Sequence, residues 1–173
     1  MKNLKIDIKP GQLIFVYQPD TDGLIIPLTC IKNENNKFWY ACDKPIQWQI
    51  GKELSVRGPI GKGFHPIDQE GKILFIIPGE IIGSLRPLID DAIQSQKNVA
   101  IFCKNIDWQI HPNAEIISLE DLDFALNWAD FIYLECTRNE LKNILDIINL
   151  IKERRIPSET NILSSEFCRS PLW

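Results

Sequence analysis

The sequence predicts a small antiparallel β-barrel followed by an α/β Rossmann-like domain with a parallel sheet. Before position 57 it reads as short strand-forming segments about ten residues apart, which is typical of a small barrel. After position 71 it reads as strands that alternate with helices, which is typical of a parallel sheet. Residues 57–66, between the two, hold three glycines and two prolines. We therefore expect a barrel domain at residues 1–66 and a Rossmann-like domain at residues 67–173.

The composition is that of a globular protein. Of its 173 residues 45% are hydrophobic, which suffices for one medium domain or two small ones, and the formal net charge is −4. The basic run at residues 152–155 falls at an expected helix C-terminus, where cations face the carbonyl end of the helix dipole, so we expect no nucleic-acid partner. No apolar stretch reaches the roughly 18 residues of a membrane span, and the N-terminus lacks a signal-peptide apolar region. We expect a cytoplasmic protein with no membrane partner.

The first half is expected to be made of short strands separated by turns. The expected strands cover residues 2–8, 12–17, 24–31, 38–42 and 52–56, and residues 45–50 form another short extended piece. Pro27 interrupts the third segment, and because proline cannot donate to a strand ladder it should lie at an edge, a bulge or a strand start. The regular spacing of these strands favours a barrel or a sandwich.

The second half is expected to alternate strands and helices. The expected strands cover residues 72–77, 99–103, 114–117, 131–135 and 158–163. The first is a continuous apolar run, which indicates a strand buried on both faces. An apolar stripe at residues 85–93 predicts a helix. Ser118, with an acid three positions further on, predicts the start of a short helix that ends near Trp128. Thr137 and Glu140 fit a capping box, which predicts the start of a long amphipathic helix.

The glycine-rich segment at residues 57–66 has two interpretations. Glycine allows a backbone or a ligand to approach closely, so the segment is a weak candidate for a phosphate-binding loop. It lacks the spacing of a dinucleotide fingerprint and the following Lys-Ser/Thr of a phosphate loop. The alternative is a tight turn at the domain boundary.

The cysteines and histidines of the sequence give little support for a metal site or a hydrolytic active site. The five cysteines are scattered without zinc-type spacing, namely Cys30, Cys42, Cys103, Cys136 and Cys168. All but Cys168 lie in or at the end of strand-like runs, where cysteine usually acts as a small buried hydrophobe. His65 and His111 each precede proline in expected loops, with no nucleophile spaced to match. We expect no metal site and no hydrolytic triad.

Three segments of the first half resemble motifs of the ferredoxin-NAD(P)H reductase superfamily, in the same order and at similar intervals. Residues 10–14 resemble its Pro-Gly-Gln-Phe strand, and residues 26–29 resemble its Arg-Pro-x-Ser flavin motif. Residues 58–64 resemble its Gly-Pro-Leu-Gly-Asn-Gly-Phe segment. The pattern is most similar to the electron transfer subunit of dihydroorotate dehydrogenase.

The second half resembles the same family. Residues 76–88 stand where the family has a glycine-rich turn that ends in Ala-Pro-Leu, and residues 135–139 stand where it has Cys-Gly-Pro. Residues 156–168 resemble the segment that leads into its iron-sulfur loop. The resemblance implies FAD held between barrel and Rossmann-like domain. The residues that it assigns to cofactor binding are Pro27, Thr29, Gly58, Gly61, Lys62, Gly63, Phe64 and Gly79.

The departures from these motifs weaken the expected cofactor sites. Ile26 replaces the arginine whose guanidinium pairs with the flavin, so FAD binding should be weak or absent. The family's dinucleotide turn has adjacent glycines, whereas Gly79 and Gly83 are separated by three residues here. One of these residues, Glu80, would repel a phosphate, which argues against NAD(P)H binding. Cys168 stands alone in the tail, so this chain by itself should hold no [2Fe–2S] cluster.

Three hypotheses of function remain open from the sequence. The first is a flavin-dependent electron-transfer subunit that works with a redox partner subunit or as a homo-oligomer. The second is a cofactor-poor relative that acts as a binding or scaffolding protein. The third is an unrelated α/β protein whose glycine-rich segment matches by coincidence.

Overall fold

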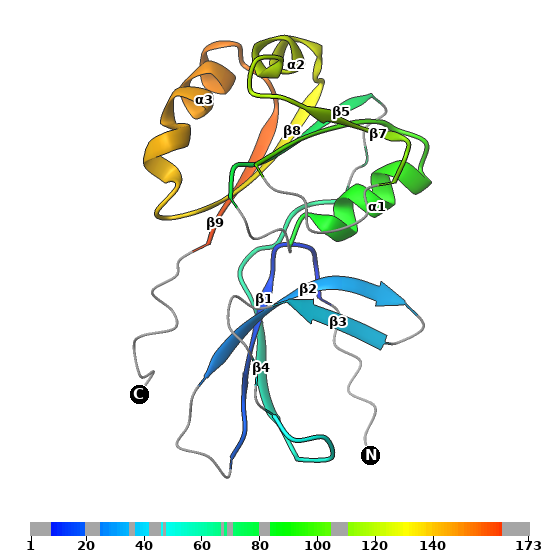
Figure 1. The fold of residues 1–173 in the computed structure, drawn as a ribbon, viewed down its shortest axis with the longest axis vertical. Coiled ribbons are helices and arrows are strands. Elements are labelled where there is room, and N and C mark those ends of the chain that lie inside the picture. The colour runs from blue at the N-terminus through cyan, green and yellow to red at the C-terminus, as the bar shows by residue number, and fades with distance from the viewer. Residues whose placement is uncertain are drawn as a thin grey trace.

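The structure is a computed structural model, and it describes residues 8–19, 25–34, 37–41, 46, 48–66, 68, 71–79, 84–104 and 111–163. Two sheets lie one after the other along the chain (Figure 1). The first is antiparallel and barrel-like, and the second is parallel and flanked by helices. The predicted fold class is confirmed.

The barrel-like sheet contains β1 (Leu13–Tyr17), β2 (Ile26–Glu34), β3 (Lys37–Ala41) and β4 (Ser55–Ile60). Their spatial order is β3-β2-β1-β4, and every pairing is antiparallel. Because alternate residues of a strand share a face, Ile14 and Val16 of β1 meet Ile26 and Leu28 of β2 in one apolar cluster. This cluster is the core of the first part of the chain.

Pro27 lies where its chemistry requires. It is the second residue of β2 and stands opposite Phe15 of β1, whereas the pairing of β2 with β3 starts only at Thr29. The prediction that Pro27 lies near a strand start is confirmed.

The glycine-rich segment and its surroundings differ in part from the expectation. The strand expected at residues 52–56 begins at Ser55 and continues through Gly58 and Pro59 to Ile60, so the loop starts only at Gly61. The extended piece expected at residues 45–50 is not a strand in its described part. Residues 48–51 lead into a turn in which the Lys52 amide donates to the Gln49 carbonyl oxygen. Most of the strand expected at residues 2–8 lies outside the described residues.

The parallel sheet contains β5 (Lys72–Ile77), β6 (Asn98–Cys103), β7 (Ala114–Ile117), β8 (Phe131–Thr137) and β9 (Ser158–Leu163). Their order is β7-β6-β5-β8-β9, so the chain moves outward from β5 first in one direction and then in the other. All five strands were expected from the sequence, the first of them from a continuous apolar run between turn residues. The apolar run of β5 is buried from Ile73 to Ile77, as expected for a central strand with both faces covered.

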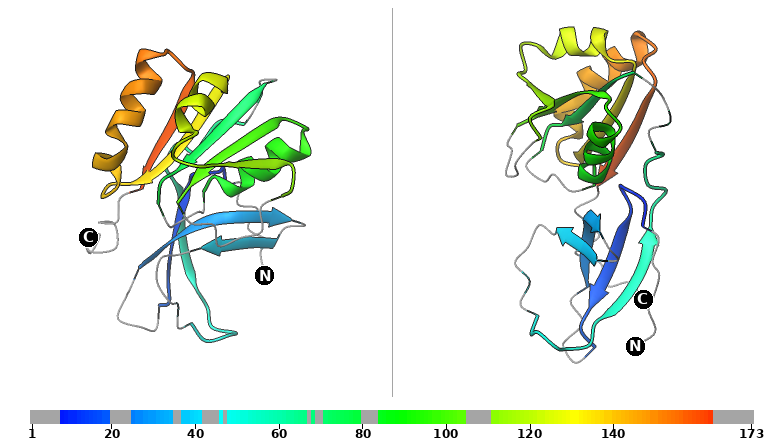
Figure 2. Two further views of the ribbon diagram at one scale, coloured as in Figure 1. Left: turned by 45° about the horizontal axis from the view of Figure 1, so that its top comes forward. Right: turned by 90° about the vertical axis from the view of Figure 1, so that its right-hand side faces the viewer.

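Helices cover both faces of the parallel sheet (Figures 1 and 2). On one face, α1 (Arg86–Gln94) packs with Phe64, Phe75 and Tyr133. On the other face, α2 (Leu122–Trp128) and α3 (Leu141–Glu153) pack against Leu74, Ile76 and other residues of β5 and β8. α2 begins at Leu122, after a turn at residues 119–121. The contact expected of a cap at Ser118 is present in this turn, since the Ser118 hydroxyl oxygen accepts from the Asp121 amide.

Candidate functional site

The loop after β4 is shaped by its packing against a turn near the N-terminus. Gly61 and Gly63 have φ values of +97° and +69°, in the left-handed region that favours glycine. A Cβ on Gly63 would come within 2.9 Å of the Pro10 carbonyl oxygen and 2.8 Å of the Lys9 Cβ. The glycine at this position is therefore required by a close contact between two segments of the protein.

Hydrogen bonds hold this loop in place. The Phe64 amide donates to the Pro10 carbonyl oxygen at 2.7 Å, and the Gln12 side-chain amide donates to the Gly61 carbonyl oxygen at 2.9 Å. The Phe64 ring then packs edge-on against Tyr133 of β8, with centroids 5.6 Å apart. The loop thus connects the barrel-like sheet to the parallel sheet through buried contacts, and its Phe64 amide is used within the protein.

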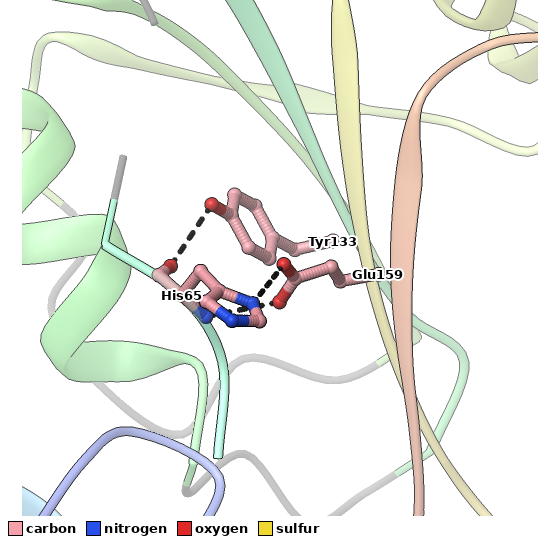
Figure 3. Close-up of polar contacts among 3 residues, drawn as sticks. All are labelled: His65, Tyr133 and Glu159. Atoms are coloured by element: carbon pink, nitrogen blue, oxygen red, sulfur yellow. Dashed lines mark hydrogen bonds and ion pairs between the residues drawn. The ribbon is translucent and has the colours of Figure 1, made fainter. Parts of the chain in front are cut away.

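His65 is the next residue, and it is fixed by three hydrogen bonds (Figure 3). Its amide donates to Glu159 Oε2 at 3.0 Å, and its Nδ1 lies 2.6 Å from Glu159 Oε1. Its carbonyl oxygen accepts from the Tyr133 hydroxyl at 3.2 Å. The imidazole is nevertheless 80% exposed. His65 is a loop residue, as the sequence suggests, but its main chain and one ring nitrogen are held by two strands of the parallel sheet.

The surroundings of Tyr133 are electronegative. Burial raises the pKa of its phenol to about 12, and the charges of Glu159, Asp68 and Asp91 add to the increase. The hydroxyl therefore stays protonated and serves as a hydrogen-bond donor. Neither Tyr133 nor Glu159 stands out in the sequence, because each is one residue of an ordinary strand and its partner lies far away along the chain.

A groove opens where the glycine-rich loop meets β9. We call it the junction groove; it has a volume of about 380 Å³ and is lined by Lys62, Gly63, Phe64, His65, Glu159, Thr160 and Asn161. A neighbouring hollow of about 250 Å³ shares His65 and Glu159 and continues along Pro66, Asp68, Lys72 and Tyr133. Asn161 also reaches the first part of the chain, since its side-chain amide donates to the Gly11 carbonyl oxygen at 3.3 Å. The junction groove thus lies between the loop that follows the barrel-like sheet and the last strand of the parallel sheet.

The structure brings part of the expected flavin site together. Lys62, Gly63 and Phe64 line the junction groove. Thr29 stands opposite Leu13, which stands opposite Ile60, so Thr29 lies two strands, or about 10 Å, from the end of β4 where Gly61 follows. Gly58 lies within β4, and a Cβ there would come 3.0 Å from the Leu13 carbonyl oxygen.

Two further positions from the family comparison do not line the junction groove. Ile26, which stands where the family has its arginine, is only 8% exposed and packs with Ile14 and Leu28. An arginine at this position would have to bury its charge in an apolar cluster. Gly79 lies apart from the junction groove lining, directly beyond the end of β5.

A second polar cluster lies where β5 and β8 end. A Cβ on Gly79 would meet both carboxylate oxygens of Glu140. Glu140 Oε2 also accepts from the Thr137 amide and from the Thr137 hydroxyl, each at 2.8 Å. The Thr137–Glu140 contact expected before α3 is therefore present, and it turns the Glu140 carboxylate toward the end of β5.

Glu135 of β8 is the most deeply buried charged residue of this cluster. Its side chain is 2% exposed, and Oε1 accepts from the Ser84 hydroxyl just before α1. Oε2 has no hydrogen-bond partner among the described residues. Burial raises the pKa of Glu135 to about 7; the Ser84 hydroxyl and the amides of Leu85 and Ser84 oppose the increase, and the charge of Glu140 adds to it. Glu80 and Gly83 lie outside the described residues.

Three of the five cysteines lie in the described part of the chain. Cys30 and Cys136 are buried in strands, as expected, and Cys103 is half-buried at the end of β6. Cys42 and Cys168 lie outside the described residues. Within the described residues, no three His, Cys, Asp or Glu side chains are grouped so that they could hold a metal ion. In that same part of the chain, no helix has the length and apolar character needed to cross a membrane.

Comparisons with known proteins identify the fold. The chain matches no protein-family model and no curated protein sequence. It is similar in structure to a ferredoxin reductase in carbazole 1,9a-dioxygenase, with a TM-score of 0.66 and 17% identity over 90% of this chain and 58% of that one. It is also similar to a cytochrome P450 reductase from Amycolatopsis, with a TM-score of 0.62 and 12% identity over 91% of this chain and 62% of that one.

A third similar structure is the flavohem-like FAD/NAD binding domain of nitric oxide dioxygenase from Vibrio cholerae O1 biovar El Tor. Its TM-score is 0.62 at 12% identity, over 92% of this chain and 86% of that one. The chain thus spans about three fifths of the first two structures and most of the third. At these identities the likeness defines the fold, and the chain has the two-part fold of ferredoxin reductase-type FAD/NAD-binding domains.

Proposed function

We propose that this chain is an electron-transfer component that holds FAD at the junction of its two sheets, of the type found in the electron transfer subunit of dihydroorotate dehydrogenase. The observation that carries the proposal is the junction groove of about 380 Å³, lined by the glycine-rich loop on one side and β9 on the other. Its size falls in the usual range of small-molecule sites, and it lies where two folded parts meet. A redox partner subunit or a second copy of the chain would exchange electrons with it.

The residues present fit a flavin dinucleotide in part. Lys62 is exposed in the lining and would supply a cation to the pyrophosphate. Gly61 and Gly63 carry no side chain and would let a ligand approach the backbone. Pro27 and Thr29 of β2 would contribute from the barrel-like sheet. When bound, FAD would supply the capacity to accept and release electrons, while these residues bind and orient it.

Two observations favour weak binding. Ile26 is packed in the apolar cluster where the family motif has a cation, and the Phe64 amide donates to Pro10 and is lost as a donor to phosphate. A missing charged hydrogen bond typically costs about 1.5–3 kcal/mol, or roughly 10- to 150-fold in affinity. These same observations favour the second candidate function, a cofactor-poor binding or scaffolding protein.

A flavin titration separates the two functions. We expect apoprotein to bind FAD with a dissociation constant above about 10 μM. Quenching of flavin fluorescence during the titration measures this binding. Lys62→Ala should weaken binding roughly 5- to 10-fold, because one solvent-exposed cation is lost from the groove. Lys52→Ala is the matched control, since Lys52 is an exposed lysine outside the groove lining. Ile26→Arg is unsuitable as a repair, since Ile26 is buried.

Each outcome decides between the hypotheses. Protein that is purified with stoichiometric FAD would contradict weak binding and strengthen the electron-transfer function. Equal weakening by both lysine variants would show that the junction groove is not the flavin site. Absence of saturation at millimolar FAD would favour the cofactor-poor binding protein.

A further inference from the structure

The ends of β5 and β8 form the place where a doubly wound sheet normally binds its ligand. These strands are neighbours, and the chain leaves them toward opposite faces: β5 continues into α1, and β8 continues into α3 on the other face. Ligands of such sheets bind beyond the strand ends at this switch point. A dinucleotide phosphate typically binds there to the amides at the start of the first helix, with glycine below it.

Glu135 occupies the start of that helix in this chain. Residues of β8 alternate between faces, and Glu135, two positions after Tyr133, faces α1. Its carboxylate accepts from the Ser84 hydroxyl, and the amides of Ser84 and Leu85 lie near enough to lower its pKa. It therefore uses the positive end of the α1 dipole, which a phosphate would otherwise use.

Glu140 occupies the space above the glycine. Its two carboxylate oxygens fill the position that a side chain on Gly79 would take, and two hydrogen bonds from Thr137 hold them there. Glu140 and Glu135 are close enough that the charge of Glu140 acts on Glu135. Oε2 of Glu135 is buried and has no hydrogen-bond partner among the described residues.

We propose that Glu135 and Glu140 are internal anions that take the place of the dinucleotide phosphates, so that this Rossmann-like domain excludes NADH and NADPH. The expected pyrophosphate would have to displace one carboxylate from α1 and another from Gly79, and it would meet two like charges. The inference goes beyond the proposed function. It means that a flavin in the junction groove exchanges electrons with a protein partner and not with a nicotinamide nucleotide bound by this chain.

The test compares nucleotide binding by the whole chain before and after the two charges are removed. The double variant Glu135→Gln/Glu140→Gln keeps the size of both side chains. Glu120→Gln/Glu153→Gln is the matched control, because it changes the net charge equally at two exposed positions. NADH and NADPH are each titrated at pH 8 by isothermal calorimetry and by dihydronicotinamide fluorescence, with ADP as competitor. Circular dichroism and thermal melting show whether each variant is folded.

We expect neither the wild type nor the control to saturate up to about 1 mM nucleotide, and the double variant to bind at least about 10-fold more tightly, in competition with ADP. The single variant Glu140→Gln leaves the buried Glu135 in place, so its gain in nucleotide affinity should be smaller. This single variant replaces the double variant if the double variant does not fold.

Two results would overturn the proposal. The first is saturable wild-type binding of either nucleotide in the micromolar range. The second is a folded double variant, or a folded Glu140→Gln variant, that binds no more tightly than the wild type. FAD titration of the same variants is a separate readout: loss of flavin binding counts against the proposed function alone, because neither glutamate lines the junction groove.

Discussion

Nδ1 of His65 lies 2.6 Å from Oε1 of Glu159, a residue 94 positions further along the chain. Because the same carboxylate also accepts from the His65 amide, one glutamate of β9 holds both the ring and the main chain of the connecting loop. The pair therefore sets the position of the loop that carries Lys62 and Gly63 to the junction groove.

Removing this contact should loosen the junction without unfolding the protein. We expect His65→Ala to lower the free energy of unfolding by about 0.5–1 kcal/mol, a small loss because the imidazole is mostly exposed and screened by solvent. His111→Ala is the control, since the His111 side chain accepts from the amide of Asn113, two residues further along the chain. Urea unfolding measures both, and a double-mutant cycle with Glu159→Gln measures the coupling. Additive effects of the two substitutions would contradict the contact.

Gly63 should tolerate no side chain, and Gly51 provides the comparison. Both have positive φ, so an alanine at either costs about 1–2 kcal/mol of backbone strain. A Cβ on Gly63 would also meet Pro10 and Lys9, whereas no described atom lies within 4 Å of a Cβ on Gly51. We therefore expect Gly63→Ala to be roughly 1–3 kcal/mol more destabilising than Gly51→Ala in chemical denaturation. Equal losses would show that the loop does not press against the Pro10 turn.

Glu135 should make stability depend on pH between about 5 and 8. Its pKa in the folded protein, about 7, lies above the ordinary 4.5, so the native state binds this proton more tightly than the unfolded state does. The resulting stabilisation is complete below about pH 4.5 and is lost as the pH rises through about 7. Between pH 5 and 8 the loss should amount to about 2–3 kcal/mol.

Glu135→Gln removes this titration and can keep an oxygen for the Ser84 hydroxyl. Denaturation of wild type and variant at pH 5 and pH 8 should therefore show the variant gaining relative to the wild type at the higher pH. Glu153→Gln, at an exposed position at the end of α3, should follow the wild type. A difference between Glu135→Gln and wild type that stays constant with pH would mean that the carboxyl titrates normally.

The buried thiol of Cys136 should resist alkylation in the native protein. Burial raises the pKa of Cys136 to about 11, and the charges of Glu140 and Glu135 contribute, so little thiolate is present at pH 8. Peptide mapping after iodoacetamide treatment should show Cys103, which is only half-buried, labelled faster than Cys136. Denaturant should remove the difference; comparable rates in the native state would contradict the burial of Cys136.

The strands and helices could be predicted because they have local signals. The apolar run of β5 and the capping box before α3 specify their elements within a few residues. The glycine-rich segment was harder to interpret, because glycine and proline suggest a loop although Gly58 and Pro59 lie within β4.

The site could be predicted only where it follows from neighbours in sequence. Lys62 and Phe64 were expected to contribute and do line the junction groove. The contacts of Glu135 with Ser84 and of Glu159 with His65 join residues 51 and 94 positions apart. The pattern of apolar and polar residues along the chain does not predict such pairs, because each glutamate occupies a strand position that either a polar or an apolar residue could fill.

The hydrogen bond from the Asn161 side chain to the Gly11 carbonyl oxygen spans 150 positions. During synthesis the barrel-like sheet leaves the ribosome first, and domains generally fold in that order. Asn161 belongs to β9, which emerges after every other described strand. The sheets can each begin to fold early, but the junction between them can be completed only when translation has passed β9. Until then the Pro10–Gly11 turn lacks this contact, and His65 at the end of the groove-lining loop lacks its two contacts with Glu159 of the same strand.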